Sequence, residues 1–416
     1  MQVRIHRGAH EIGGSCVEVE SNGSRIVLDV GKPLWAEWNE HVPLPLVAGL
    51  AEGSDPSLAG LLISHPHMDH YGLIDQVDAR VPLFIGREAA SLLKAAELFS
   101  SAGVELHPTG YLSDRVPLQI GAFTVTPFLV DHSGFDSYSL LIEAGGRRLF
   151  YSGDFRGHGR KASLFKRLLD QPPLPINALL CEGTHIRREQ TTDEVPRSEL
   201  DVELSLAKIM SETTGAAYVV SSAQNIDRLV TVYRASKRAR RTLVTDLYTA
   251  TLSHAIGRPT IPQPGFPDYK VYIPNRQRVL VKQSGEFDRL EFIRDCRVYP
   301  EWLLTNRHTV TLLMPSSTVP ELLRANALHD GVVVWSLWPG YLSEPSGARM
   351  RRTLEAAGVP FVLDHASGHA SVTDLQLLAT ALRPGKVVPI HTEAGDRFDE
   401  YFADVEAHSD GEWWEV

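Results

Sequence analysis

The residues best suited to chemistry form one hexapeptide, which runs from His65 to His70 after the apolar residues 61–63. It contains four candidate metal ligands, namely His65, His67, Asp69 and His70. Imidazole nitrogens and carboxylate oxygens are ligands that proteins offer to divalent transition metals. This spacing does not fit one helix face, which requires steps of three or four residues. We therefore expect a loop that curls around a metal ion at a strand end, and a His-rich surface loop is the alternative.

Three more candidate ligands follow other apolar runs of the chain. His132 comes after the predicted strand 123–130, Asp154 after the strand 148–151, and His391 after the strand 386–390. Loops at the strand ends along one edge of a sheet come together in space, and functional residues concentrate on such loops. We therefore expect His132, Asp154 and His391 to join the hexapeptide in one site.

Together these positions give seven ligands, which exceeds the four that one tetrahedral zinc ion needs. Two adjacent ions, with Asp154 as the bridge, account for the set better. Such a pair can activate a hydroxide and stabilise charge on a phosphoryl oxygen. The ligands are nitrogen and oxygen atoms without cysteine, so we expect two Zn²⁺ ions, with Mn²⁺ as an alternative. Hydrolysis is therefore the favoured reaction class. Nucleotide-driven and hydride chemistry have no support, because no phosphate-binding or dinucleotide glycine motif is present.

Further residues could act on a substrate or orient a ligand. His369 lies in a loop of small residues with Ser367 and Gly368, where backbone N–H groups and an imidazole could approach a phosphate. An exposed loop histidine is the alternative for His369. Glu182 follows the predicted strand 178–181 and could orient a histidine, or it could simply be an acid at a strand end.

Two polar residues precede the predicted helix 226–239. Ser221 and Asn225 could contact a phosphate, because a helix N-terminus attracts anions. Capping of the helix is the alternative.

The elements that must position these residues fall into three parts. Strands predominate in residues 1–188, with a predicted hairpin turn at 21–24 and a helix at 87–99. Helices and strands alternate from 189 to 362, which predicts βαβ units and a mainly parallel sheet. Residues 363–416 return to the first pattern, with strands at 360–364 and 386–390 and a helix at 373–382. We therefore expect an α/β protein in which 189–362 form an inserted domain.

Composition limits the class of protein. The chain has 416 residues, three widely spaced cysteines and a formal net charge of -10. There is no apolar run of about 18 residues, so no membrane span is expected. The start has no signal-peptide pattern, and the cysteines predict neither disulfides nor a zinc ribbon, so we expect a cytoplasmic protein. The acidity argues against non-specific nucleic-acid binding, although bound metal ions would add positive charge.

The hexapeptide resembles the HxHxDH signature of the metallo-β-lactamase superfamily. His132 and Asp154 resemble its next two ligand motifs. Glu182, His369 and His391 resemble motifs A, B and C of the β-CASP nucleases, and the loop at 367–370 is most similar to that of ribonuclease J-like enzymes. Thr392 departs from the glycine that is usual there. From the sequence we expect neither the extra C-terminal domain of ribonuclease J nor a KH-type domain before the first strand.

The resemblance implies an αββα metallo-β-lactamase sandwich with a two-metal site and an inserted β-CASP domain. It implies a metal-dependent exo- or endonuclease that hydrolyses single-stranded RNA, because motif C is His rather than Val. His65, His67 and His132 would hold one ion, and Asp69, His70 and His391 the other. His369, supported by Glu182, would assist the departing oxygen. A homodimer is compatible with this resemblance.

Three other functions remain open from the sequence. A DNA nuclease on the same scaffold is the nearest alternative. A metallohydrolase of a small lactone, thioester or lactam is a second alternative, although such a substrate needs no inserted domain. A catalytically silent RNA-binding protein is a third, and the complete ligand set speaks against it.

Overall fold

The computed structural model describes residues 1–37, 40–100, 102–187 and 196–416, and these divide into two compact units. The first unit comprises Met1–Ala90, Glu105–Val195 and Gly368–Val416. The second comprises Ser91–Val104 and Pro196–Ser367. We predicted an inserted domain at 189–362. The main segment of the second unit, Pro196–Ser367, begins and ends a few residues later than that range. The second unit also takes in 91–104, which we had placed in the first domain.

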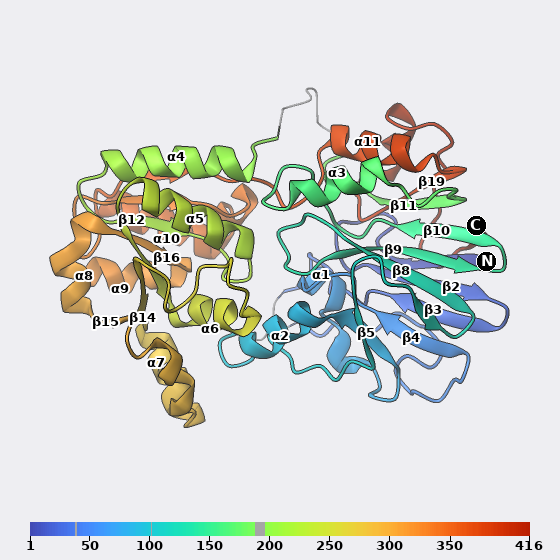
Figure 1. Cartoon of the computed structure of the whole chain (residues 1–416), viewed down its shortest axis with the longest axis horizontal. Helices are drawn as coiled ribbons and strands as arrows, with labels where there is room; N and C mark the ends of the chain where they lie inside the picture. Colours follow the sequence, from blue (N-terminus) through green and yellow to red (C-terminus); the bar gives the residue numbers. More distant parts are fainter. Residues whose placement is uncertain (38–39, 101, 188–195) are drawn as a thin grey trace. The chain divides into compact units, whose positions relative to one another are not determined.

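Two sheets form the centre of the first unit (Figure 1). In order across the first sheet, the strands are β20 (Trp413–Glu415), β1 (Gln2–Arg7), β2 (Cys16–Ser21), β3 (Ser24–Leu28), β4 (Leu58–Leu62), β5 (Leu83–Gly86) and β6 (Gly110–Leu112). Across the second sheet they are β19 (Lys386–Ile390), β11 (Ala178–Glu182), β10 (Arg147–Tyr151), β9 (Tyr138–Ala144), β8 (Phe123–Leu129) and β7 (Leu118–Ile120). The first and last strands of the chain are therefore neighbours in one sheet.

The sheets enclose one apolar core, and helices cover the outer face of the second sheet. Alternate residues of β1, such as Val3 and Ile5, are fully buried in this core, as the two-residue period of a strand requires. A second cluster joins the other face of β10 and β11 to α3 (Ala162–Asp170) and α11 (Val372–Leu382). The layered αββα architecture predicted from the sequence is confirmed.

The hairpin between β2 and β3 shows how local sequence fixes the register. Asn22 and Gly23 both have positive φ angles, of 52° and 72°. This is the combination that a two-residue type I′ turn requires, and Asn-Gly is its preferred sequence. Ser21 pairs with Ser24, and from there Val19 pairs with Ile26 and Val17 with Leu28. The predicted turn at 21–24 is therefore confirmed.

Strand direction explains why distant ligands meet. β10, β11 and β19 are mutually parallel, and β8 runs the same way because β9 is antiparallel to both β8 and β10. The carboxyl ends of these four strands therefore lie along one edge of the sheet. His132, Asp154, Glu182 and His391 each lie at or just beyond one of these ends.

A single sheet organises the second unit, and all of its neighbouring strands are parallel. Its order is β15 (Arg297–Val298), β14 (Tyr269–Tyr272), β13 (Thr242–Asp246), β16 (Val310–Met314), β12 (Ala217–Val220), β17 (Val332–Trp335) and β18 (Phe361–Leu363). The helices are α4 (Glu199–Glu212), α5 (Ile226–Arg238), α6 (Leu247–Ile256), α7 (Asn275–Ser284), α8 (Pro300–Asn306), α9 (Val319–Arg324) and α10 (Pro345–Ala356). The predicted parallel sheet is confirmed.

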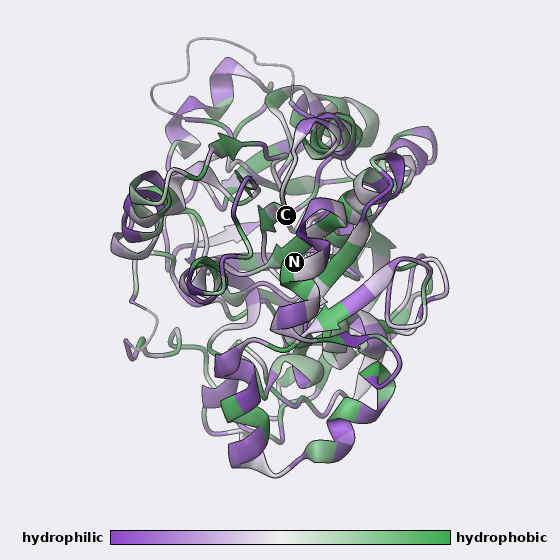
Figure 2. Cartoon of the chain, turned by 90° about the vertical axis from the view of Figure 1, so that its left-hand side faces the viewer, coloured by the Kyte–Doolittle hydropathy of each residue, from purple (hydrophilic) through white to green (hydrophobic). Residues whose placement is uncertain are grey.

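Hydrophobic colour is concentrated on the central strands in Figure 2, and the helices alternate between hydrophilic and hydrophobic residues. Leu303, Leu322 and Leu354, from α8, α9 and α10, contact the core on one face of the parallel sheet. Such alternation is typical of helices with one buried face.

Three local predictions were wrong. The hexapeptide is not wholly a loop, because Met68–Tyr71 form one helical turn, α1, after His67. We also expected the strand at 360–364 to open the last part of the chain. It instead pairs with β17 at the edge of the second unit's sheet. The helix expected at 87–99 ends earlier, since α2 covers Arg87–Ala96.

No helix in the part of the chain that the structure describes is both long and apolar enough to cross a membrane.

Candidate metal centre

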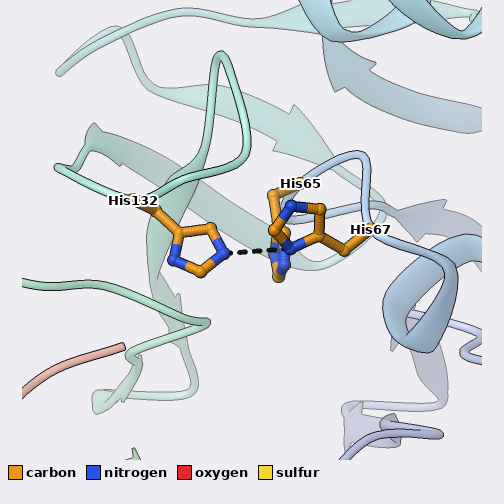
Figure 3. Close-up of side chains that lie close together, drawn as sticks. All are labelled: His65, His67 and His132. Carbon is orange, nitrogen blue, oxygen red and sulfur yellow. Dashed lines mark hydrogen bonds between the residues drawn. The ribbon is translucent and has the colours of Figure 1, made fainter. Parts of the chain in front are cut away.

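Three histidines of the first unit converge on one point (Figure 3). His65 and His67 come from the loop after β4, and His132 from the loop after β8. The Nδ1 atom of His67 lies 3.1 Å from Nε2 of His132. His65 is fully buried, and its ring centroid lies 4.9 Å from that of His67 and 4.7 Å from that of His132. One nitrogen from each ring lies within 4.8 Å of the others, which is a spacing that a shared metal ion explains.

A second group lies beside the first. Asp69 and His70 come from the helical turn α1, Asp154 from the loop after β10, and His391 from the end of β19. The Nε2 atom of His391 lies 3.2 Å from the Oδ2 atom of Asp69, and Nε2 of His70 lies 3.2 Å from Oδ2 of Asp154. Asp154 also reaches the first group, because its Oδ2 atom lies 3.5 Å from Nε2 of His65. The structure thus brings all seven predicted ligands together.

Hydrogen bonds on the far side of the rings orient the imidazoles. Nδ1 of His132 lies 2.5 Å from the carbonyl oxygen of Gly368, so this nitrogen carries the proton. Nδ1 of His70 likewise faces the carboxylate of Asp29 at 2.8 Å. In the neutral form of each ring, the unprotonated nitrogen is then Nε2, which faces the centre. An outer partner of this kind fixes the tautomer that a metal ligand needs.

Unsatisfied buried atoms test whether the residues fit metal ions. Among the described residues, Nε2 of His65, Nε2 of His70 and both carboxylate oxygens of Asp154 are buried and make no hydrogen bond. Buried polar atoms without a partner are rare in native proteins and call for an explanation. These atoms all point into the same centre, so divalent metal ions would satisfy them. The site therefore fits divalent metal ions that bind imidazole nitrogens and carboxylate oxygens.

The charge states of the three histidines in the first group agree with this fit. Burial lowers the pKa of His65 and His132 well below the ordinary value, and it lowers that of His67 to about 4. Burial also disfavours the charged form of His70, but Asp154, Asp29 and Asp69 outweigh it and raise its pKa well above the usual range. The first three histidines are therefore neutral near pH 7, which is the form that binds metal.

His369 lies beside the centre with its own set of partners. Its Nδ1 atom is 3.2 Å from Oε2 of Glu182 and 3.1 Å from Oγ1 of Thr184. The other oxygen of Glu182 accepts the backbone N–H of Phe155 at 3.1 Å, so this carboxylate is held on both sides. Burial opposes the charged form of His369, but Glu182 and then Asp154 prevail and raise its pKa to about 9. His369 also falls in a four-residue group with Asp154, Glu182 and His391.

Backbone conformation at the centre is constrained. His391 has a φ of 53° and Asp29 a φ of 59°. The left-handed region is uncommon for residues other than glycine, and such outliers concentrate at functional sites. A Cβ atom on Gly31 would lie 1.8 Å from the carbonyl oxygen of Asp69, so only glycine allows this chain crossing. Gly13 lies against the side chain of Asp69.

The predicted substrate-binding residues are divided between the units. Gly368 and His369 belong to the first unit, whereas Ser221, Asn225 and Ser367 belong to the second. Asn225 caps α5, since its side chain accepts the N–H of Arg228 at 2.9 Å. Ser221 is buried at the end of β12. A role for Ser221, Asn225 and Ser367 in substrate binding stays a prediction.

Sequence reasoning missed Thr184, whose hydroxyl also lies 3.0 Å from Nδ1 of His391. It missed Ser64 and Tyr151 as well, which share Asp29 with His70. Thr184 follows Glu182 by two residues at the same strand end, and that position was the signal that could have found it.

Comparisons with known proteins agree with this centre. Residues 34–191 match the model of the β-lactamase superfamily domain. Ribonuclease J of Sinorhizobium meliloti is 25% identical over 374 residues, which cover 84% of this chain and 60% of that protein. Ribonuclease J of Helicobacter pylori is 20% identical over 400 residues, which cover 93% of this chain and 55% of the relative. The chain is similar to ribonuclease J over most of its length, and residues 34–191 are similar to the β-lactamase superfamily domain.

The match to the superfamily covers six of the seven candidate ligands, all except His391. Ribonuclease J of Mycoplasma genitalium is 23% identical over 413 residues, which cover 93% of this chain. A crystal structure of a protein of unknown function from Enterococcus faecalis V583 covers 99% of both chains with a TM-score of 0.81 and 20% identity, and this likeness concerns the fold. The chain spans little more than half the length of the first two ribonuclease J relatives.

Proposed function

We propose that this chain is a metal-dependent ribonuclease that hydrolyses phosphodiester bonds of single-stranded RNA. The observation that carries the proposal is the position of His369 beside a centre of seven candidate ligands. A metal centre alone would suit many hydrolases. An imidazole held by Glu182 and Thr184 next to that centre adds a group that can act on a departing oxygen. The named activity of the ribonuclease J relatives supports RNA as the substrate.

In this proposal, His65, His67 and His132 would hold one ion, Asp69, His70 and His391 would hold the other, and Asp154 could serve both, because its Oδ2 atom lies near His65 and His70. The ions would be Zn²⁺, with Mn²⁺ as the alternative, because the ligands are imidazoles and carboxylates. When bound, such ions supply an activated water and positive charge for a phosphoryl oxygen.

Other residues of the chain orient the ligand rings and His369. Asp29 and the carbonyl of Gly368 hold the rings of His70 and His132 in the orientation that presents Nε2. Nδ1 of His369 is occupied by Glu182 and Thr184, which leaves Nε2 to donate a hydrogen bond to the departing oxygen of the RNA. Glu182 keeps this ring in place because its second oxygen is tied to the backbone after Asp154.

Replacement of Asp69 and His369 tests these roles. We expect Asp69→Asn to lower kcat on a single-stranded RNA by at least about 10³-fold, because a ligand of the second group loses its charge. We expect His369→Ala to lower kcat by about 10²- to 10⁴-fold while the metal content stays unchanged, because a general acid contributes about that much. Initial rates measure kcat, circular dichroism shows whether each variant is folded, and metal analysis measures the metal content.

His185→Gln is the matched control. Its ring lies 6.4 Å from that of His369, but it belongs to none of the ligand groups among the described residues. This variant should retain activity within a few-fold of the unchanged protein. Full activity of a folded, metal-loaded Asp69→Asn protein would show that the ligand assignment is wrong.

A further inference from the structure

A large aromatic side chain is exposed on the first unit without an evident structural reason. Trp35 is 65% exposed, and its neighbour Leu34 is 60% exposed. Tryptophan is usually well buried, and paired exposed apolar residues often mark a binding surface.

This segment is fixed to the backbone that carries the metal ligands. The N–H of Lys32 donates to the carbonyl of Met68 at 2.9 Å, and Gly31 passes directly over the carbonyl of Asp69. A Cβ atom on Gly13 would lie 2.8 Å from Cγ of Leu34 and 2.9 Å from Cβ of Asp69. The side chains of Leu34 and Asp69 therefore flank the same glycine. Trp35 follows Leu34 directly, so its backbone is next to this part of the chain.

The indole ring is held in place rather than free to rotate. Its Nε1–H donates to Oε2 of Glu11 at 2.9 Å. Burial raises the pKa of Glu11, and the bond from Trp35 and the charges of Arg7 and His391 oppose that rise. The edge of the ring is thus anchored while much of its surface stays open to solvent. A pre-oriented aromatic surface binds a flat partner at a low entropic cost.

We propose that Trp35 is a stacking platform for a nucleobase of the single-stranded RNA whose cleaved phosphate lies at the metal centre. Proteins that bind single strands use exposed aromatic rings in this way, and stacking tolerates any base because every base has a π face. Glu11 anchors the ring, and Leu34 extends the apolar surface. The proposal rests on the proposed ribonuclease function and adds a base-binding position that is separate from the metal ligands.

Trp35→Ala tests the platform. Stacking contributes about 1–3 kcal/mol per base, so KM for a short RNA should rise by about 5- to 150-fold while kcat changes by less than about threefold. Trp35→Phe keeps an aromatic face and should stay within a few-fold of the unchanged protein. Trp338→Ala removes another exposed tryptophan, which is 52% exposed in the second unit, and serves as the matched control.

Substrates with one abasic nucleotide locate the stacked base. The unchanged protein should show raised KM when the abasic position coincides with the base that meets Trp35, and Trp35→Ala should lose that sensitivity. Bis(p-nitrophenyl) phosphate, which has no base, should be hydrolysed equally by both proteins. These three readouts separate stacking from a general loss of structure.

The inference is overturned if Trp35→Ala cleaves RNA with unchanged KM and the same abasic profile. It is also overturned if Trp35→Ala converts a dimer to a monomer in sedimentation without affecting KM, because the surface is then a protein interface. Failure of the unchanged protein to cleave RNA at all would instead reject the ribonuclease proposal, and this inference with it.

Discussion

Asp29 shows how one residue away from the metal ligands can set the geometry of the centre. It is fully buried, and its Oδ2 atom accepts from the hydroxyl groups of Ser64 and Tyr151, both at 2.7 Å, and faces Nδ1 of His70 at 2.8 Å. Ser64 in turn lies 3.0 Å from Nδ1 of His65. One carboxylate therefore orients ligands of both metal groups.

At this scale we predict that Asp29→Asn lowers the affinity for the metal ions by about 10- to 100-fold, the usual cost of losing an outer partner of a ligand. Tyr151→Phe removes one donor but keeps the carboxylate, so it should have a smaller effect. Competition with a chromophoric chelator measures both affinities. An Asp29→Asn protein with unchanged affinity would contradict this role for Asp29.

At the scale of elements, a buried ion pair joins α4 to α5 in the second unit. Arg228 and Glu199 are both fully buried, and their side chains lie 2.9 Å apart. Arg228 also donates to the carbonyl of Ser336 after β17 at 2.7 Å, and to that of Ala366 at 3.3 Å. The guanidinium of Arg228 thus links α4 and α5 to the segments that follow β17 and β18.

Removal of one partner from such a pair leaves a buried charge uncompensated, which costs about 3–5 kcal/mol. We therefore predict that Glu199→Ala destabilises the second unit by about that amount in urea unfolding. Glu355→Ala breaks the exposed Arg351–Glu355 pair of α10 and is the matched control, for which no resolvable change is expected. Equal midpoints for the two variants would show that the buried pair is not important for stability.

At the scale of the whole molecule, the metal centre depends on segments that are far apart in the chain. The ligands range from His65 to His391, and the second unit's segment 196–367 lies between them in sequence. Metal ions that bind only the folded first unit should stabilise it by about 4 kcal/mol at a thousandfold excess over Kd. We predict that chelation lowers the Tm of that unit in calorimetry, and that Asp69→Asn reduces this shift. A chelator without any effect on the Tm would speak against a resident metal.

The sequence predicted the layered first unit, the parallel sheet of the second unit and the seven candidate ligands, because strand ends and ligand types are local signals. It did not predict the helical turn at 68–71, because the ligand spacing indicates that the whole hexapeptide is not one helix face and gives no signal for a single turn after His67. It also missed the transfer of 91–104 to the second unit, where Phe99 stacks on Tyr248. The contacts of Thr184 with His369 and His391 join residues that are far apart in the chain, so no local sequence pattern predicts them.

Cleavage of matched RNA and DNA oligonucleotides by the metal-loaded protein tests the central claim most directly. The two substrates share one sequence and carry a label at the 5′ end, and products are sized over time with and without a chelator. The account predicts metal-dependent cleavage of the RNA, at least about tenfold slower cleavage of the DNA, and no cleavage by Asp69→Asn. Equal or faster cleavage of the DNA, or RNA cleavage that survives both chelation and Asp69→Asn, would contradict it.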